Sequence, residues 1–243
     1  MSWALRADHI QQMDEQGYLV LEGFLEESEI LPLEQALEDY QQRQYQTGTL
    51  QDRPREVLFA QKVAERDPWV QAFVQCDAFV RLSTTFLGPD TDLYFNQMVY
   101  KNPGGSTPFS WHQDDAYGPV VPSPYLTVWI AITDMDEQNG CLWVMPASHK
   151  QGLREHTEGG FGLSCHSLEA PDQGVPLPVV RGSLVVFWST TMHKSGPNLS
   201  SHTRKAFILQ FSCVGIRQKA SGMLIRSRVP IARAGILVCE RNG

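Results

Sequence analysis

The spacing of apolar residues predicts helices in the first third of the chain. Within residues 27–44, apolar side chains recur at steps of three and four positions, as Ile30, Leu33, Leu37 and Tyr40. This spacing places them on one face of a helix, which can then pack against the rest of the protein. A similar pattern predicts a helix over residues 67–87, which Gly88 and Pro89 would end.

Two shorter elements precede these helices. Residues 8–16 predict a short helix in which Asp8 caps the first amides and Gly17 provides a left-handed end. The apolar run 18–25 predicts a short strand. The polar stretch 45–55 has no clear period, and we interpret it as a loop.

From residue 93 onward the pattern changes to short apolar runs separated by Gly, Pro, Ser and Asn. Six runs predict strands: LYFNQMVYK, PFSWHQD, YLTVWIAITDM, CLWVMP, GSLVVFW and KAFILQFSCV. Many short strands with frequent turns indicate a mainly β sandwich or barrel, and a jelly roll belongs to that set. We expect one domain over 1–243, with a mainly helical part at about 1–90, a jelly-roll core at about 91–214 and a tail at 215–243.

The composition supports a folded protein and excludes some classes of partner. Apolar residues make up 42% of the chain, enough to fill a large core, and the formal net charge is −7. Nucleic acid and anionic membrane surfaces attract basic proteins. We therefore expect neither as a partner and favour a small-molecule substrate, while the oligomeric state is not readable.

Cysteine usage and the amino terminus indicate a cytoplasmic protein. The five cysteines are scattered and form no CxxC pair, which fits reduced thiols better than a disulfide framework or a zinc knuckle. The first residues become polar almost at once, and no later run has the length of a membrane span.

Histidines followed two residues later by an acidic residue are candidate metal ligands. With 27 acidic residues in 243, any such position is acidic about one time in nine, so seven histidines give a match by chance roughly half the time. The chain has two matches, His112 with Asp114 and His156 with Glu158. Only His112 and Asp114 end a predicted strand, where residues two apart point to the same face. The same alternation favours Asp114 over Asp115, and we interpret His156 and Glu158 as part of a solvated loop.

A third ligand and an anion-binding residue follow further along the chain. His193 lies 79 residues after Asp114 (193−114), beyond the apolar run GSLVVFW. Two histidines and one carboxylate leave positions open on an iron(II) ion, although zinc could use the same ligands. Arg204 lies eleven residues after His193 (204−193), and a turn between them would bring its guanidinium back towards the metal. That group can grip a carboxylate with two hydrogen bonds.

These residues resemble the phytanoyl-CoA dioxygenase family of iron(II)- and 2-oxoglutarate-dependent oxygenases. The resemblance runs from about residue 8 to 213 and covers most of the chain. It is carried by DEQGYLVLEGFL, LYFNQMVYKNPGG, WHQDDAY, LTVWIAITDMDEQNGCLWVMPASHKQG and MHKSGPNLSSHTRKAF. The run NGCLWVMPASHK is the most characteristic of these pieces.

The resemblance implies a double-stranded β-helix, a cupin-like jelly roll with helices outside it. It implies iron(II) held by the catalytic residues His112, Asp114 and His193, with dioxygen and 2-oxoglutarate as cosubstrates and Arg204 as the partner of 2-oxoglutarate. It also implies that three residues either line the cosubstrate pocket or fill the core: Gln97, Trp129 and Ser195. A lysine that some relatives use upstream of the core has no clear match here.

The reaction expected is hydroxylation of an unactivated C–H bond of a small metabolite, with release of succinate and CO2. Relatives that halogenate carry a small residue in place of the carboxylate, so Asp114 disfavours halogenation, while desaturation and ring formation stay open. Asp115 and Tyr117 are expected near the mouth of the substrate pocket. The substrate could be a natural-product intermediate or an acyl or amino-acid compound. Other classes that fit the same residues are a zinc-dependent hydrolase and a non-catalytic jelly-roll binding protein.

Overall fold

The computed structural model describes residues 5–47, 57–105, 107–159, 162–165 and 174–238. Among the described residues up to 87 there are four α-helices: α1 (Ala7–Gln16), α2 (Glu27–Gln46), α3 (Pro68–Val74) and α4 (Asp77–Leu87). In α2, the predicted apolar face is buried and Pro32 lies near the start, where proline is tolerated. The expected loop at 45–55 therefore begins later than predicted, and most of it lies outside the described residues.

Two details of the helices differ from the sequence-based expectation. The N-cap of α1 is Arg6, and Asp8 lies in the first turn and accepts a hydrogen bond from the Arg6 guanidinium at 2.8 Å. Gly17 does end α1 in the left-handed region, with φ of 80°.

The helix expected over residues 67–87 is divided into α3 and α4. Asp67 caps α3 by accepting hydrogen bonds from the backbone amides of the next turn. The chain leaves the helix at Gln75 and starts again at Asp77. This break brings the rings of Phe73 and Phe79 to 5.5 Å, edge to face, so aromatic packing compensates for the lost helical hydrogen bonds.

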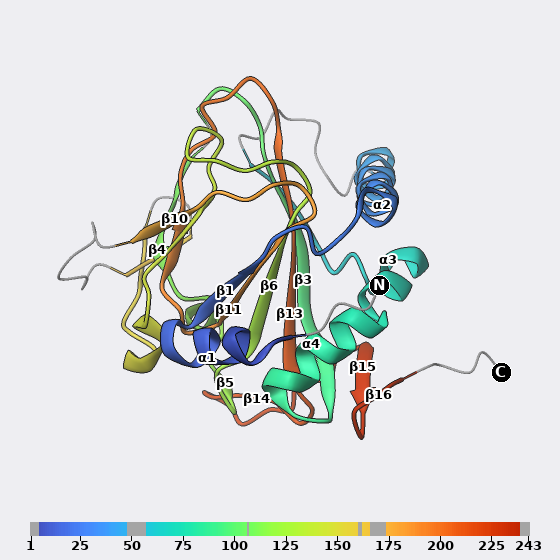
Figure 1. The fold of residues 1–243 in the computed structure, drawn as a ribbon, viewed down its shortest axis with the longest axis vertical. Coiled ribbons are helices and arrows are strands. Elements are labelled where there is room, and N and C mark those ends of the chain that lie inside the picture. Colours follow the sequence, from blue (N-terminus) through green and yellow to red (C-terminus); the bar gives the residue numbers. More distant parts are fainter. Residues whose placement is uncertain (1–4, 48–56, 106, 160–161, 166–173, 239–243) are drawn as a thin grey trace.

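Two antiparallel sheets form the core of the molecule (Figure 1). The larger follows the order β1-β11-β6-β13-β3-β15-β16, with β2 also paired to β3. Its strands are β1 (Tyr18–Leu21), β2 (Val57–Gln61), β3 (Thr91–Lys101), β6 (Leu126–Ala131), β11 (Leu184–Trp188), β13 (Arg204–Cys213), β15 (Val229–Arg233) and β16 (Ile236–Leu237).

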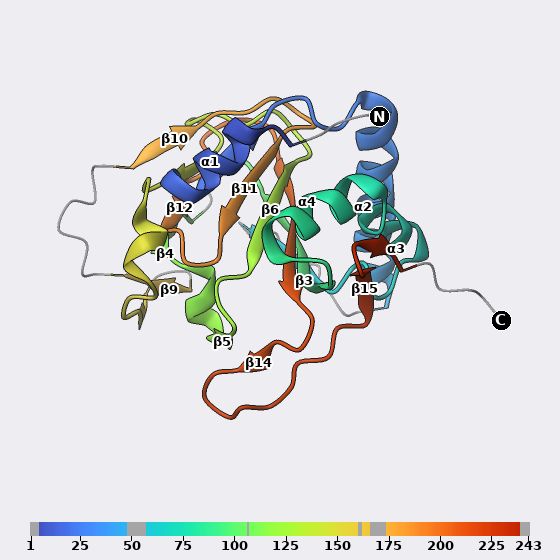
Figure 2. The same ribbon diagram turned by 60° about the horizontal axis from the view of Figure 1, so that its bottom comes forward.

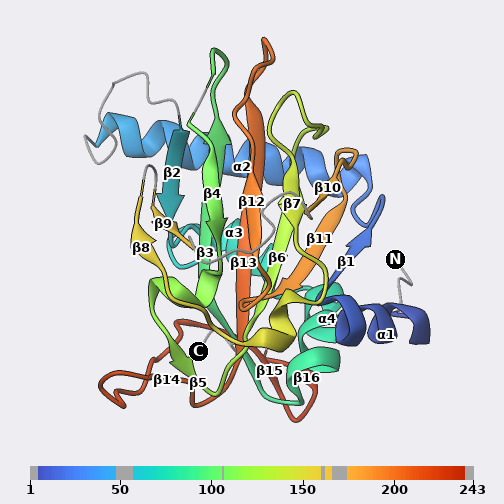
Figure 3. The ribbon, with the colours of Figure 1, turned by 90° about the vertical axis from the view of Figure 1, so that its left-hand side faces the viewer.

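The smaller sheet faces the viewer in Figure 3, with α2 behind the molecule. Its order is β10-β7-β12-β4, from β4 (Phe109–His112), β7 (Leu142–Val144), β10 (Val175–Leu177) and β12 (His193–Ser195). Two short pairs remain: β5 (Val120–Val121) with β14 (Arg217–Gln218), and β8 (Thr157–Glu158) with β9 (Leu163–Ser164). Short 3-10 helices cover Asp114–Tyr117 (η1) and Ser148–Gln151 (η2). The mainly β jelly-roll fold predicted from the sequence is confirmed.

The larger sheet is buried on both faces, which explains its continuous apolar runs. Along β6, Leu126, Val128 and Ile130 pack under the helices, whereas Trp129 and Ala131 face the smaller sheet. Alternate residues of a strand point to opposite faces, so both faces need apolar residues wherever both are covered. Only every second residue of each strand in the larger sheet therefore points into the cavity between the two sheets.

Segments outside the expected core also join the larger sheet. From the first 90 residues, β1 pairs with β11 and β2 with β3. From the segment expected as a tail, β15 pairs with β3, and the loop carrying β14 extends towards β5 (Figure 2). Within the described residues, no helix is long and apolar enough to cross a membrane.

Candidate functional site

The three candidate metal ligands predicted from the sequence lie together in the structure. His112 ends β4 and His193 begins β12, and the two residues are opposite each other in the register of these strands. Asp114 follows at the start of η1. One donor atom from each side chain lies within 4.8 Å of the others, and Nε2 of His193 is 3.6 Å from Oδ1 of Asp114.

Each imidazole is fixed by a hydrogen bond at its Nδ1 atom. Nδ1 of His112 donates to the carbonyl of Ser110 at 2.7 Å, and Nδ1 of His193 donates to that of Thr191 at 3.0 Å. A carbonyl oxygen only accepts, so each proton is on Nδ1 and each Nε2 keeps a lone pair. Burial, with a smaller effect of His193, lowers the pKa of His112 to about 3, which keeps this ring neutral at neutral pH.

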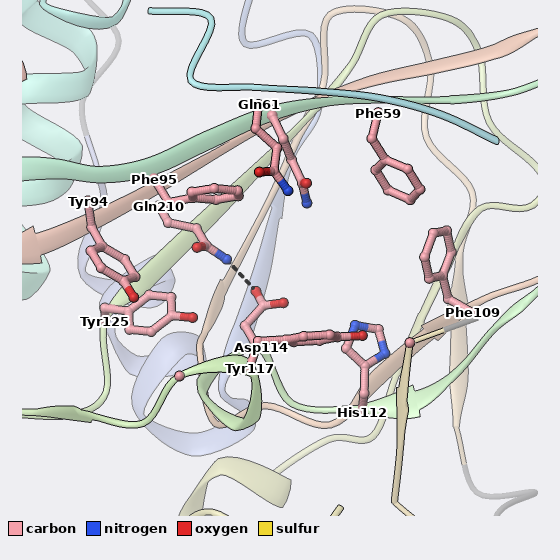
Figure 4. A pocket seen from close by; sticks show the side chains of 13 residues that line it. Phe59, Gln61, Tyr94, Phe95, Phe109, His112, Asp114, Tyr117, Tyr125 and Gln210 are labelled. Carbon is pink, nitrogen blue, oxygen red and sulfur yellow. Dashed lines mark hydrogen bonds between the residues drawn. The ribbon is translucent and has the colours of Figure 1, made fainter. Parts of the chain in front are cut away.

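Asp114 is oriented by two hydrogen bonds to one of its oxygens. Oδ2 accepts from the Thr127 hydroxyl at 2.7 Å. It also accepts from the Gln210 side-chain amide at 3.0 Å, a bond that Figure 4 shows. Thr127 on β6 and Gln210 on β13 are opposite each other in register. Oδ1, the oxygen nearer to His193, is left for a ligand. Two imidazole nitrogens and one carboxylate oxygen converge as ligands for a divalent metal, and this donor set suits iron(II) or zinc.

Gln113, between the first two ligands, connects the segments that carry all three. Its backbone is extended, with φ of −120° and ψ of 134°, so its side chain points away from those of His112 and Asp114. The buried side-chain amide donates to the carbonyls of Gly152 at 2.8 Å and Thr190 at 2.5 Å. Its oxygen accepts from the Arg154 amide at 2.8 Å. Gln113 therefore holds the His112–Asp114 segment against the residues that precede His193.

We expect the Gln113→Leu variant to bind iron(II) about 10- to 100-fold more weakly, as is usual when a group that orients metal ligands is removed. It should also unfold at a lower temperature, because the Gly152 and Thr190 carbonyls lose their donor and the latter is buried. Calorimetric titration with iron(II) under anaerobic conditions measures the affinity. Gln138→Leu, at an exposed position of a distant loop, is the matched control. An unchanged affinity in Gln113→Leu would exclude this positioning role.

A cavity extends from the three ligands to Arg204, the first residue of β13. Arg204, Ile208 and Gln210 are separated by even numbers of residues on β13, so their side chains point to the same face, towards the space between the two sheets. The other residues that the sequence assigned to the cosubstrate also line this cavity: Gln97, Trp129 and Ser195. The structure thus places all four of these residues beside the ligands.

Arg204 is a buried cation without an ion-pair partner among the described residues. Its side chain is fully enclosed, with 2% of the residue exposed, and Nε makes no hydrogen bond. Among the described residues, the guanidinium donates only to the Val99 carbonyl, at 3.5 Å, and it lies 5.4 Å from the centre of the Trp129 ring. Burial lowers the pKa of Arg204 to about 9, so it stays charged at neutral pH. An unpaired buried charge is costly, which indicates that an anion completes this site.

Lys101 lies opposite Arg204 in the register of β3 and β13. Its side-chain nitrogen donates to the backbone carbonyls of Ser195, at 3.3 Å, and Gly196. Burial, followed by repulsion from Arg204, lowers the pKa of Lys101 to about 6. The lysine is therefore largely neutral at neutral pH, and it fixes the backbone beside the cavity while Arg204 supplies the charge.

The two residues expected near the substrate lie in different surroundings. Tyr117 lines a larger pocket next to His112 and Asp114, and its hydroxyl accepts from the Leu163 amide at 3.0 Å. Asp115 is buried, accepts hydrogen bonds from Ser123 at 2.9 Å and from the Val120 amide at 3.3 Å, and does not line that pocket. Its carboxylate is thus used to hold its own loop.

His156 is less exposed than expected for a solvated loop. Its Nδ1 donates to the Arg154 carbonyl at 2.9 Å, and its Nε2 accepts from the backbone amide of Gln113 at 3.0 Å. Glu158 is exposed on β8. His156 therefore supports the Gln113 segment and is not one of the three clustered ligands.

Sequence reasoning did not assign roles to four residues around the ligands: Gln113, Thr127, Gln210 and Lys101. Thr127 and Gln210 did leave a signal, because each is an isolated polar residue within a buried apolar strand. A buried polar group needs a partner, so such positions are candidates for a site.

Comparison with known proteins gives a family and several relatives. The sequence model described as phytanoyl-CoA dioxygenase (PhyH) matches residues 13–206. A probable alpha-ketoglutarate-dependent hypophosphite dioxygenase of Stutzerimonas stutzeri is 28% identical over 151 residues, or 59% of this chain and 52% of that protein. Phytanoyl-CoA dioxygenase domain-containing protein 1 of Rattus norvegicus is 39% identical over 118 residues, or 45% of this chain and 40% of that protein. The matches span about half the length of these two relatives.

A solved structure shares the fold. EvdO2 from Micromonospora carbonacea var. aurantiaca, crystallised with 2-oxoglutarate, superposes with a TM-score of 0.73 at 20% identity. The superposition covers 90% of this chain and 95% of that chain.

Proposed function

This chain belongs to the phytanoyl-CoA dioxygenase family, and from that premise we propose that it is an iron(II)- and 2-oxoglutarate-dependent oxygenase. We propose further that it hydroxylates an unactivated C–H bond of a small molecule and releases succinate and CO2. The two relatives are named as dioxygenases, one of them alpha-ketoglutarate-dependent.

The observation that carries the proposal is the shared cavity of Arg204 and the three ligands. A metal site alone fits several reactions. An unpaired buried cation in the same cavity adds a place for a carboxylate, and 2-oxoglutarate has one carboxylate for such a cation and a second one, beside its keto group, for a metal. A cavity with both features fits this cosubstrate better than it fits the water of a zinc hydrolase.

The residues take the following roles in this proposal. His112 and His193, through Nε2, and Asp114, through Oδ1, hold the metal. Arg204 binds the distal carboxylate of 2-oxoglutarate, and the Trp129 ring supports the guanidinium. Gln97 and Ser195 line the rest of the cosubstrate cavity.

Iron(II) with 2-oxoglutarate and dioxygen supplies the oxidising chemistry, which no side chain of the site has by itself. The protein orients the reactants and excludes water, because His112, His193 and Arg204 are buried and Asp114 is only partly exposed. Asp114 occupies the position that a small residue would leave open for a halide, so the proposal is oxygen insertion and not halogenation.

We expect anaerobic addition of iron(II) and then 2-oxoglutarate to give the weak visible charge-transfer absorption of a metal-bound 2-oxo acid. Admission of dioxygen should then yield succinate, measured by chromatography. Addition of zinc in place of iron is the control, because zinc has no such absorption. A protein that binds zinc tightly and forms neither the absorption nor succinate with iron would instead be a hydrolase or a binding protein.

A further inference from the structure

A second, larger cavity opens beside His112 and Asp114, with a volume of about 510 Å³. This volume is typical of sites for small organic ligands. Rings form most of its wall: Phe59, Tyr94, Phe95, Phe109, Tyr117 and Tyr125. Figure 4 shows these side chains around the pocket, with Phe95 and Tyr117 bordering it from opposite sides in this view.

The rings are held in place by contacts with one another. Phe59 and Phe109 meet edge to face at 5.8 Å, and Tyr94 lies 5.1 Å from Tyr125. The Tyr117 ring stands at 85° to that of His112, 5.8 Å away. A wall of fixed aromatic rings favours flat or apolar ligands, which can stack on the ring faces or pack against the ring edges.

Four polar side chains of this cavity are neutral and available to a ligand: Gln61, Gln97, Tyr94 and Tyr125. Gln61 on β2 and Gln97 on β3 are opposite each other in register, and both line the cavity. Their side-chain amides make no hydrogen bond to any residue that the structure describes. Burial raises the pKa of Tyr94 and of Tyr125, so both phenols keep their protons and can donate. Neutral donors and acceptors suit the hydroxyl and carbonyl groups of a ligand.

The described residues that line this cavity bring almost no charge to it. Of the described residues that line it, only Asp114 has a charged side chain, and Asp114 belongs to the metal site. The basic residues Arg217 and Lys219 lie on and beside β14 and do not line the cavity. The neighbouring cavity offers a direct comparison, because there the chain provides a buried Arg204 for an anion.

We propose, building on the oxygenase function above, that the substrate is an uncharged compound with a flat ring system that bears hydroxyl or carbonyl groups. Its rings pack between the aromatic side chains, and its oxygens bond to Gln61, Gln97 and the two phenols. A free carboxylate, an amino acid or the phosphates of coenzyme A would find no cation among the described residues of this wall, and such burial of charge is strongly unfavourable.

The test compares an uncharged ring compound with its charged acid and with a charged acyl thioester. The protein is loaded anaerobically with iron(II) and saturating 2-oxoglutarate, so that the Arg204 cavity is occupied. Methyl 6-hydroxy-2-naphthoate, the corresponding free acid and hexanoyl-CoA are then titrated calorimetrically. We expect the ester to bind at least about tenfold more tightly than the acid, because the acid buries an unpaired charge. Equal or tighter binding of the acid or of hexanoyl-CoA, or no binding of the ester, overturns the proposal.

A variant at the rim of the cavity gives a second readout. Gln61 is exposed, so Gln61→Arg adds a cation without disturbing the core. It should shift the ester-to-acid preference towards the acid by about tenfold, since a charge-assisted hydrogen bond replaces a neutral one. Gln35→Arg, on the exposed side of α2, adds the same charge elsewhere and should leave the preference unchanged. An unchanged preference in Gln61→Arg would contradict the proposed position of the ligand.

The visible absorption of the iron–2-oxoglutarate complex is recorded in each sample before a compound is added. A missing absorption would show that the oxygenase function is wrong. An intact absorption with the acid or hexanoyl-CoA bound more tightly would show that only the substrate class is wrong.

Discussion

The Asp114→Ala variant is expected to form no 2-oxoglutarate-dependent succinate and to bind iron(II) more than about 100-fold more weakly. It loses the only anionic ligand of the cluster, and two neutral imidazoles hold a divalent cation poorly. Thr127 and Gln210 also lose their shared acceptor, so the surrounding donors become unpaired. Succinate chromatography and anaerobic calorimetry with iron(II) measure the two effects.

Asp77→Ala is the matched control for this substitution. Asp77 is exposed on α4 and forms a weak ion pair with Arg81 at 3.8 Å, so its loss should leave succinate formation and iron(II) affinity unchanged. Circular dichroism establishes that both variants are folded. Succinate formation at the wild-type rate in a folded Asp114→Ala protein would show that the metal site lies elsewhere.

The local part of this site could be predicted from the sequence because it depends on strand alternation. His112 and Asp114 are two residues apart, and the extended backbone of Gln113 keeps both side chains on one face although β4 has already ended. The same alternation places Arg204, Ile208 and Gln210 on the inner face of β13. The two-residue period of a strand is enough to assign each of its residues to one face or the other.

The parts that sequence reasoning missed depend on contacts between distant segments. Gln113 bonds to Gly152 and Thr190, 39 and 77 residues away, and no local pattern specifies such partners. The pairing of β15 with β3 joins distant segments in the same way, with Val229 opposite Leu93. Asp115 and Asp114 are neighbours of the same type, yet a 3-10 turn directs one to its own loop and the other to the cluster.

Arg204 combines a binding role with a cost to the fold. The protein encloses a guanidinium without a carboxylate partner among the described residues, and this burial opposes folding until an anion binds. A structural arginine would be expected to have its partner within the chain, as Arg181 has in Glu27 and Glu34. Removal of the Arg204 charge should therefore weaken the binding of 2-oxoglutarate. It should not lower the stability of the protein without 2-oxoglutarate.

We expect Arg204→Met to raise the KM for 2-oxoglutarate by more than about 100-fold, because loss of one partner of a buried ion pair typically costs about 3–5 kcal/mol. In the absence of 2-oxoglutarate, the same variant should unfold at the wild-type temperature or above it, since an apolar side chain replaces an unpaired buried charge. Arg204→Lys should restore only part of the affinity, because an ammonium group cannot bind a carboxylate in the bidentate manner. Steady-state kinetics and thermal unfolding with and without 2-oxoglutarate measure these effects.

Arg81→Met is the control for the loss of an arginine, because Arg81 is half-exposed on α4 and pairs only weakly with Asp77. It should change neither the KM nor the stabilisation that 2-oxoglutarate gives. A structural role for Arg204 makes the opposite prediction, namely a large loss of stability in Arg204→Met without 2-oxoglutarate and an unchanged KM in whatever protein stays folded. The direction of the change in unfolding temperature thus separates a residue that awaits an anion from one that supports the fold.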